Sequence, residues 1–161
     1  MFQYLNKKEK DLWLPRLFDL YYENMHAIAP SGLSYEAEKE AWLAEVSPGL
    51  EKAPRQVILC LLDGELAGYL QYYIRENMLM VEELQLKKHL WQTTMFCGFC
   101  RYLLSVLPGD LERVEAYAHK PNTRSVHLME KLGMQAVEED SPFVHMAGSA
   151  QRIYARLGRK E

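Results

Sequence analysis

Long apolar runs, cysteines and excess positive charge are all scarce in this sequence. No apolar run approaches the ~18 residues that a membrane-spanning helix needs, and the opening MFQYLNKKEKD lacks the apolar core of a secretory signal. Only three cysteines occur in 161 residues, so we expect a reducing, cytoplasmic setting rather than a disulfide framework. The formal net charge of −3 disfavours nucleic-acid binding, which normally goes with a basic surface.

Apolar and charged residues occur in the proportions of an ordinary soluble globular protein. Hydrophobic residues make up 48% of the chain and charged residues 25%. The length suffices for one sizeable core, and no internal repeat or low-complexity segment divides the sequence. We therefore expect a single domain over residues 1–161.

The first third of the chain predicts a short strand and two helices. Residues 1–5 suit a strand, and a helix follows from Asn6 to about residue 26, kinked or restarted at Pro15 because proline lacks an N–H donor. Ser34 is a good N-cap for a second helix that reaches about residue 46. The Ser-Pro-Gly sequence at residues 47–49 is expected to stop this helix.

The middle of the chain predicts an antiparallel meander of three strands. Turn signals at residues 63–64 (Asp-Gly) and 76–77 (Glu-Asn) separate apolar segments. The strands that these turns join are expected over residues 57–62, 66–74 and 78–86.

The rest of the chain alternates helix and strand, a mixed α/β pattern. Residues 86–104 have apolar positions at helical spacing, and residues 113–119 alternate as a strand. The remaining expected elements are a helix over residues 124–132, strands over 134–138 and 151–157, and an irregular segment over 140–150.

Cys97 and Cys100 form a C-x-x-C pair that raises the question of redox or metal chemistry. A reactive pair usually sits at a helix N-terminus, where the helix dipole lowers the thiol pKa, whereas we expect Cys97 some way into its helix. The third cysteine, Cys60, falls in a separate strand, and no His/Cys cluster gives four zinc ligands. The pair is more simply two small buried residues, and we expect no metal site.

Residues 114–134, VEAYAHKPNTRSVHLMEKLGM, carry the most specific motif in the chain. The Asn-x-x-Ser at residues 122–125 follows a predicted strand, and LMEKLGM at residues 128–134 places Gly133 where a left-handed turn is needed. This pattern resembles the second half of the GCN5-related N-acetyltransferase (GNAT) superfamily. The Arg-Val-Glu-Ala that begins at residue 113 looks like the branch of ribosomal-protein N-terminal acetyltransferases.

The resemblance covers about residues 56–157 and implies both a fold and an activity. The implied fold is α/β (α+β), with a mostly antiparallel mixed sheet of about six to seven strands flanked by about four helices. In this fold the sheet is splayed between the fourth and fifth strands. The implied activity is transfer of an acetyl group from acetyl-CoA to a primary amine. The sequence leaves the identity of the acceptor and the formation of a homodimer open.

Acetyl-CoA is the cosubstrate that the resemblance implies, and three segments hold its candidate binding residues. Backbone groups at the end of the third meander strand would pair with the pantetheine arm. N–H groups at the following helix start would bind the pyrophosphate, and the Asn-x-x-Ser motif would lie by pantetheine. These residues are Leu84, Gln85, Leu86, Trp91, Gln92, Thr93, Thr94, Met95, Phe96, Asn122 and Ser125.

Three positions depart from the family pattern. Thr94 and Phe96 replace the glycines that let the phosphate loop approach the pyrophosphate, so we expect weaker binding through the loop N–H groups. Met129 stands where many members have a tyrosine that protonates the departing thiolate, which leaves Ser125 as the nearest candidate donor. These departures favour an alternative reading, a GNAT-fold pseudoenzyme that acts as a binding or regulatory module.

Glu82 and Glu83 are the candidate general bases for removing a proton from the acceptor ammonium, directly or through water. Because adjacent strand residues face opposite sides, we expect at most one of them to point into the cleft. The competing interpretation is that both are solvated carboxylates of a strand. Together with the acidic residues 138–140, they would suit a cationic acceptor.

Overall fold

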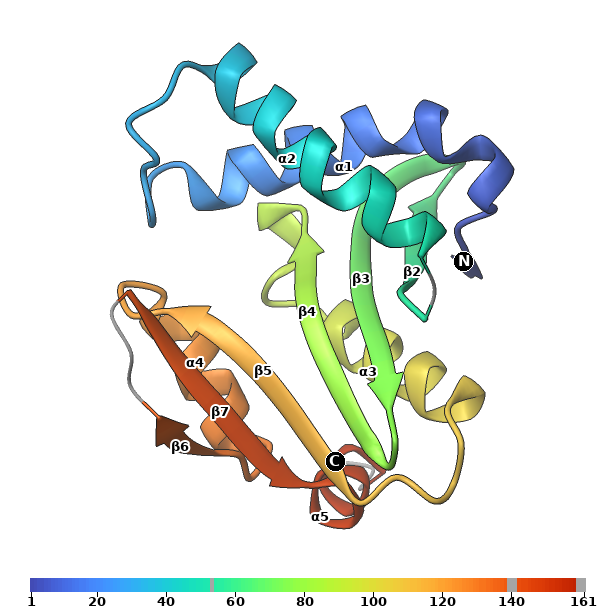
Figure 1. Cartoon of the computed structure of the whole chain (residues 1–161). Coiled ribbons are helices and arrows are strands. Elements are labelled where there is room, and N and C mark those ends of the chain that lie inside the picture. Colours follow the sequence, from blue (N-terminus) through green and yellow to red (C-terminus); the bar gives the residue numbers. More distant parts are fainter. Residues whose placement is uncertain (53, 139–141, 159–161) are drawn as a thin grey trace.

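Seven strands form one mixed sheet in the order β1-β2-β3-β4-β5-β7-β6. The computed structural model describes residues 1–52, 54–138 and 142–158, and Figure 1 shows how they are arranged. Neighbouring strands are antiparallel, except that β4 and β5 are parallel. The strands are β1 (Phe2–Tyr4), β2 (Gln56–Leu62), β3 (Glu65–Arg75), β4 (Met78–Leu86), β5 (Arg113–His119), β6 (Gln135–Glu138) and β7 (Phe143–Ser149).

Five α-helices flank the sheet within the described ranges. They are α1 (Lys10–Met25), α2 (Tyr35–Glu51), α3 (Met95–Val106), α4 (Thr123–Lys131) and α5 (Ala150–Leu157). In Figure 1, α1 and α2 cross one end of β2 to β4, whereas α3 lies behind β3 and β4, and α4 lies behind β5 and β7. The predicted fold class is confirmed, with one more helix than expected. Among these described helices, none has the length and apolar character needed to cross a membrane.

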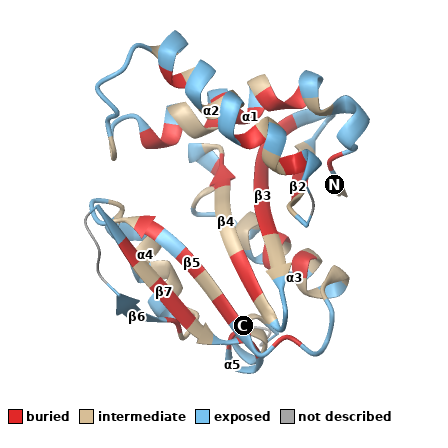
Figure 2. Ribbon diagram, viewed as in Figure 1, coloured by how far each residue is buried: buried red, intermediate tan, exposed pale blue. Residues whose placement is uncertain are grey.

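Two apolar cores occupy opposite faces of the sheet. Under α1 and α2, Leu17 packs in a cluster with Leu59 and Tyr69 of the sheet. On the other face, Phe99 of α3 packs in a cluster that includes Ile58 and extends to α5. Buried positions run along β3, β5 and β7 in Figure 2. Because each fully buried large side chain contributes roughly 1.5–3 kcal/mol, these two layers fix the helices on their faces.

The predicted meander agrees closely with β2, β3 and β4. The turn between β2 and β3 has positive φ at Asp63 (52°) and Gly64 (82°), as a type I′ hairpin turn requires. The predicted strand at residues 113–119 is β5. Gly133 has φ 94° after α4, which confirms the left-handed position expected from the motif.

The N-terminal helix is interrupted before Pro15 rather than at it. Asn6 accepts a hydrogen bond from the Lys8 amide at 3.1 Å and caps a 3-10 turn over Lys7–Glu9. The α-helix proper begins at Lys10 and continues through Pro15.

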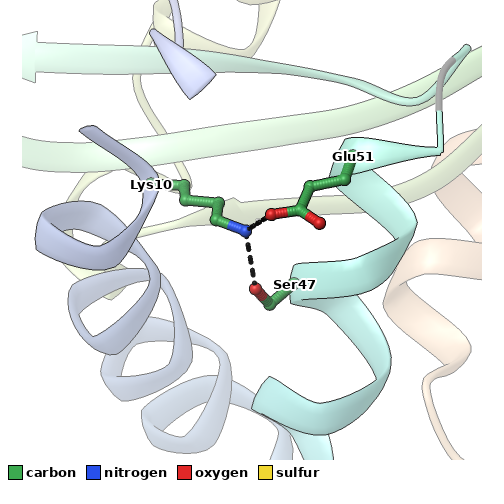
Figure 3. A network of polar contacts seen from close by, with 3 residues as sticks. All are labelled: Lys10, Ser47 and Glu51. Carbon is green, nitrogen blue, oxygen red and sulfur yellow. Dashed lines mark hydrogen bonds and ion pairs between the residues drawn. The ribbon is translucent and has the colours of Figure 1, made fainter. Parts of the chain in front are cut away.

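Helix α2 runs through residues 47–49 to Glu51, so the stop predicted there is wrong. Its last turn is held by tertiary contacts, since Leu50 is 1% exposed in the core. Lys10 Nζ donates to Ser47 Oγ at 3.2 Å and pairs with Glu51, which ties the helix end to α1 (Figure 3). These contacts offset the loss of one helical hydrogen bond at the internal proline.

The C-terminal end of the chain differs most from the prediction. Phe143–Ser149 is the strand β7 rather than an irregular segment, and Ala150–Leu157 is the helix α5 rather than a strand. Val144 and Met146 are buried two positions apart, as in a strand. In α5, Ala150 and Ile153 are buried three positions apart, as on one face of a helix. The periodicities were therefore present in the sequence, but the segments are short.

Gly68 marks the close approach between β3 and the end of β4. A Cβ atom on Gly68 would lie 2.5 Å from Leu86 Cδ2 and 2.6 Å from the Gln85 carbonyl oxygen. Since that oxygen belongs to the backbone, it cannot move aside unless β4 itself moves. Glycine at this position therefore lets β3 hold β4 in its observed place.

We expect Gly68→Ala to lower the free energy of unfolding by about 1–3 kcal/mol through overpacking. Gly109→Ala is the matched control, because a Cβ atom there would meet nothing within 4 Å. Urea denaturation of both variants measures the difference. A Gly68→Ala protein as stable as wild type would show that β4 shifts without cost, and would contradict this account.

Candidate active site

Strands β4 and β5 pair over only four residues and then separate. Met78–Val81 pair with Arg113–Ala116, and beyond them the ladder joins Glu83 to Leu86 of β4 with β3 alone among the described strands. A cavity of about 310 Å³ lies at this splay, and residues of β4, β5, α3, α4 and α5 line it. We call it the splay cavity.

A β-bulge sets the direction of the two acidic side chains of β4. Gln71 of β3 lies opposite Glu83, whereas the next residue, Tyr72, lies opposite Val81, so Glu82 is the extra residue. Residues directly opposite each other share a face of the sheet, and the Gln71 amide also donates to Glu82 Oε2 at 3.0 Å. Both carboxylates therefore lie on the face covered by α1 and α2. The prediction that at most one of them points into the cleft is wrong, because the bulge interrupts the alternation.

Glu83 is positioned by a chain of buried amides. Gln85 Nε2 donates to Glu83 Oε1 at 3.0 Å, and Asn24 Nδ2 of α1 donates to Gln85 Oε1 at 2.9 Å. Asn24 also donates to the carbonyl oxygen of Leu86 at 2.9 Å. Asn24 and Gln85 are only 5% and 7% exposed, so this chain links α1 firmly to the carboxyl group on β4.

The surroundings of Glu83 shift its pKa toward neutral pH. Burial raises the pKa of Glu83 to about 7; the neighbouring donors Gln85 and Tyr69 oppose this shift, and the charges of Glu82 and Glu45 add to it. A carboxyl group with this pKa can both accept and release a proton near neutral pH.

Glu82 is held by other groups. Its Oε1 pairs with Arg55 Nη2 at 2.5 Å, and its Oε2 accepts the hydrogen bond from Gln71. No such ion pair reaches Glu83 in the described part of the chain. Of the two predicted bases, Glu83 is therefore the one free to act.

A second cavity of about 360 Å³ lies beside the α1/α2 face of the sheet. We call it the α2 cavity, because α2 forms part of its wall. It meets the splay cavity at the residues that line both cavities: Tyr21, Val81, Glu82, Glu83 and Tyr117. The two predicted bases thus lie at the junction of two separate spaces.

The structure brings together only part of the predicted cofactor set. Leu84, Gln85, Phe96, Asn122 and Ser125 line the splay cavity. Asn122 Oδ1 accepts from the Ser125 amide at 3.3 Å and so caps α4. The remaining predicted residues do not line the cavity and lie at the end of β4, in the turn before α3 or at its first residue: Leu86, Trp91, Gln92, Thr93, Thr94 and Met95.

The turn before α3 is joined to α4 by a cation–aromatic contact. The Arg124 guanidinium lies 4.0 Å from the centre of the Trp91 ring, and Arg124 Nη2 donates to the Trp91 carbonyl oxygen at 3.2 Å. Trp91 Nε1 in turn donates to the carbonyl oxygen of Leu86 at 2.8 Å. These contacts place a cationic side chain beside the expected phosphate loop.

Helix α3 begins without glycine but still presents free amides. The Met95 N–H bonds to Thr93 Oγ1 at 3.2 Å. The amides of Phe96 and Cys97 belong to the first turn, where a helix offers them no acceptor. The positive end of the helix dipole adds to their attraction for an anion.

The C-x-x-C pair lies at the start of α3. Cys97 lies in the first turn of α3 and is exposed, so its predicted place further along the helix is wrong. Cys100 lines the splay cavity, and burial raises the pKa of its thiol to about 12. Because the thiolate is the reactive form, this shift makes the Cys100 thiol a poor nucleophile near neutral pH. Among the described residues, no group of three or more His, Cys, Asp or Glu side chains could hold a metal ion.

Several residues of the site escaped prediction from the sequence. Tyr21 and Asn24 lie on α1, and only their helical spacing shows that they face inward. Arg124 is part of the recognised motif, but its contact with Trp91 depends on the fold. Of the acidic residues 138–140, Glu138 is exposed and lines neither cavity, and residues 139 and 140 lie outside the described residues.

No family model and no curated protein sequence matches the chain. Solved structures do match. The PaiA N-acetyltransferase of Thermoplasma acidophilum, in complex with coenzyme A, gives a TM-score of 0.72 at 14% identity over 92% of this chain and 98% of that chain. The N-acetyltransferase PseH of Campylobacter jejuni, in complex with acetyl coenzyme A, gives 0.60 at 15% identity over 93% and 99%. The ribosomal-protein-alanine N-acetyltransferase of Brucella melitensis gives 0.61 at 12% identity over 92% and 99%.

The chain has the GNAT fold. At these identities the likeness is one of fold alone. The GNAT fold accounts for the sheet order and for the parallel pair that separates at Glu82. The likeness in fold does not test the expected phosphate loop, where this chain has no glycine between Leu86 and Phe96.

Glu83→Gln is expected to change how stability depends on pH. The folded-state pKa of about 7 lies above the ordinary 4.5, so between these values the folded protein holds a proton that the unfolded chain has released. Stability therefore falls as pH rises through this window, by up to about 3 kcal/mol, and glutamine removes that loss.

Denaturation of wild type and Glu83→Gln at pH 5 and pH 8 measures this effect. For each pH we take the free energy of unfolding of the variant minus that of wild type. We expect this difference to be larger at pH 8 than at pH 5. Glu40→Gln, an exposed carboxylate on α2, should show no such difference. A Glu83→Gln difference that is equal at both pH values would rule out the raised pKa.

Proposed function

We propose that this GNAT-fold chain is an acetyl-CoA-dependent N-acetyltransferase that acts on a primary amine. The observation that carries this proposal is the place of Glu83, a carboxyl group with a pKa of about 7 where the splay cavity meets the α2 cavity. A base at a junction of two cavities can serve an acceptor in one and an acyl donor in the other. We further propose that residues 1–161 form one cytoplasmic domain, nearest in kind to the ribosomal-protein acetyltransferases.

The residues of the splay cavity fit acetyl-CoA. Leu84 and Gln85 belong to the stretch of β4 that has left β5, so their backbone groups on that edge suit the amides of pantetheine. Asn122 and Ser125 supply polar groups on the opposite wall. The amides of Phe96 and Cys97, with the Arg124 guanidinium, suit the pyrophosphate.

The proposed reaction is a direct transfer. Glu83 accepts a proton from the acceptor ammonium, and the freed nitrogen lone pair attacks the thioester carbonyl carbon. The new C–N bond forms, the C–S bond breaks, and the CoA thiolate leaves. The proton on Glu83 then returns to solvent. The nitrogen loses its second proton as the amide forms, and this balances the proton that the thiolate takes from a separate donor.

The thiolate needs a proton donor other than the residue at position 129. Met129 lines the splay cavity where many GNAT enzymes have a tyrosine, and its thioether has no proton to give. Ser125 lines the same wall of α4, and we propose that its hydroxyl, through water, protonates the leaving group.

The alternative, a GNAT-fold pseudoenzyme that binds acyl-CoA as a regulatory module, is favoured by Thr94 and Phe96. Side chains at these positions keep the backbone of the phosphate loop farther from a ligand than glycine would. The two functions differ in one measurement. A chain that binds acetyl-CoA in calorimetry but never releases free CoA in the presence of amines is the pseudoenzyme. A chain that gives no heat of binding at millimolar acetyl-CoA is neither an acetyltransferase nor an acyl-CoA-binding pseudoenzyme.

Glu83→Gln is expected to lower kcat by about 10²–10⁴, the usual contribution of a general base. For wild type, kcat should rise with pH around a value of about 7 as Glu83 loses its proton, and the variant should lose this rise. Release of free CoA from acetyl-CoA gives the rate. Glu82→Gln is the control, since its carboxylate is already paired with Arg55. Equal losses in the two variants would overturn the assignment of Glu83.

Arg124→Ala is expected to weaken binding of CoA at least about tenfold, since a charge-assisted contact to phosphate is worth roughly 1.5–3 kcal/mol. Calorimetry with S-acetylpantetheine, which has no phosphate, should give the same affinity for variant and wild type. Arg101→Ala removes an exposed arginine of α3 and serves as the control. If the affinities for CoA and for S-acetylpantetheine fall equally, Arg124 stabilises the fold of the turn and does not bind the phosphates.

A further inference from the structure

The α2 cavity has a lining suited to one kind of acceptor. Besides the five residues that it shares with the splay cavity, it is lined by side chains of α2, β3 and β4 and by one arginine. These are Trp42, Glu45, Val46, Arg55, Gln71, Tyr73 and Met80. Glu45 lines only this cavity, so it lies away from the part of the site where the cosubstrate fits.

The charges that face the α2 cavity are mainly negative. Its charged lining residues are Glu45, Glu82 and Glu83 against Arg55. Arg55 is already paired with Glu82 at 2.5 Å and packs so closely on Gly49 that a Cβ there would meet its guanidinium at 1.9 Å. The one cation among these lining residues is thus neutralised, which leaves the carboxyl groups of Glu45 and Glu83 to attract a cationic ligand.

Polar and aromatic groups that line the α2 cavity also suit a cationic ligand. Gln71 is 4% exposed, and its Oε1 finds no hydrogen-bond donor among the described residues. A buried acceptor without a partner costs about 1–3 kcal/mol, which a bound N–H donor would relieve. Tyr21 and Trp42 stack with their ring centres 6.3 Å apart, and aromatic faces attract cations.

We propose that the acceptor is an α,ω-diamine, with one amine at Glu83 and the second, cationic end held by Glu45 and the Tyr21–Trp42 pair. This inference rests on the proposed acetyl transfer. The reacting amine gives its proton to Glu83 and becomes the amide nitrogen of the product. The far ammonium keeps its proton throughout and serves only to orient the chain.

A series of acceptors of equal length and different far-end charge tests this assignment. The probes are 1,4-diaminobutane, butylamine and 4-aminobutyrate, together with their three-, five- and six-carbon homologues. We expect kcat/KM to be at least about tenfold higher for the best diamine than for its monoamine, and lower again for the amino acid. Equal values across the three charges would overturn the proposal, as would a preference for the amino acids.

Glu45→Gln isolates the far anchor. Glu45 is exposed on α2, so its substitution should leave the fold intact. We expect it to lower kcat/KM for the diamine about tenfold more than for the monoamine. Glu40→Gln makes the same change of charge on α2 at an exposed position that lines neither cavity, and should change neither. Equal loss for both amines in Glu45→Gln would contradict an anchor role.

Calorimetric titration with the diamine separates this proposal from the proposed function. If no amine is acetylated, the transferase proposal fails, and the diamine inference is then decided by binding alone. Saturable diamine binding that Glu45→Gln weakens and Glu40→Gln does not would sustain the α2 cavity as a diamine site. Absence of binding would overturn it.

Discussion

The first part of strand β4 is hydrogen-bonded to β3 on one side and to β5 on the other, whereas among the described strands its last part is bonded to β3 alone. Four residues pair with β5, and from Glu82 onward the ladder continues on β3 only. The other features of the site depend on this separation, because it frees an edge of backbone and opens the splay cavity. Gly68 fixes β3 against the same part of β4, while the bulge at Glu82 directs both carboxylates to one face. Backbone pairing, rather than any single side chain, thus determines where the chemistry can take place.

The fold was largely predictable because its central strands carry clear local signals. Apolar runs and the Asp63-Gly64 turn defined β2 and β3, and the Asn122-to-Gly133 motif defined α4 and its end. Prediction failed where tertiary contacts outweigh local preference. Helix α2 continues past a proline because Leu50 is buried and Lys10 holds its last turn. Segments as short as α5 carry too few residues for periodicity alone to decide their conformation.

The candidate site was predictable in its residue types but not in its geometry. Glu83 could be identified as a candidate base, whereas a one-residue bulge leaves no mark in a single sequence. The long-range bonds were equally hidden, since Asn24 reaches Gln85 across 61 positions and Arg124 reaches Trp91 across 33. Such partners have no fixed spacing, so only the folded chain reveals them.

The two cavities lie largely on opposite faces of the sheet and touch only around the residues of the junction. Neither occupant therefore has to pass through the space of the other. For a transferase built in this way, we expect no fixed order in which donor and acceptor arrive. Under the proposed direct transfer the acyl group needs no intermediate attachment to the protein, so we expect the kinetics of a ternary complex rather than of a double displacement.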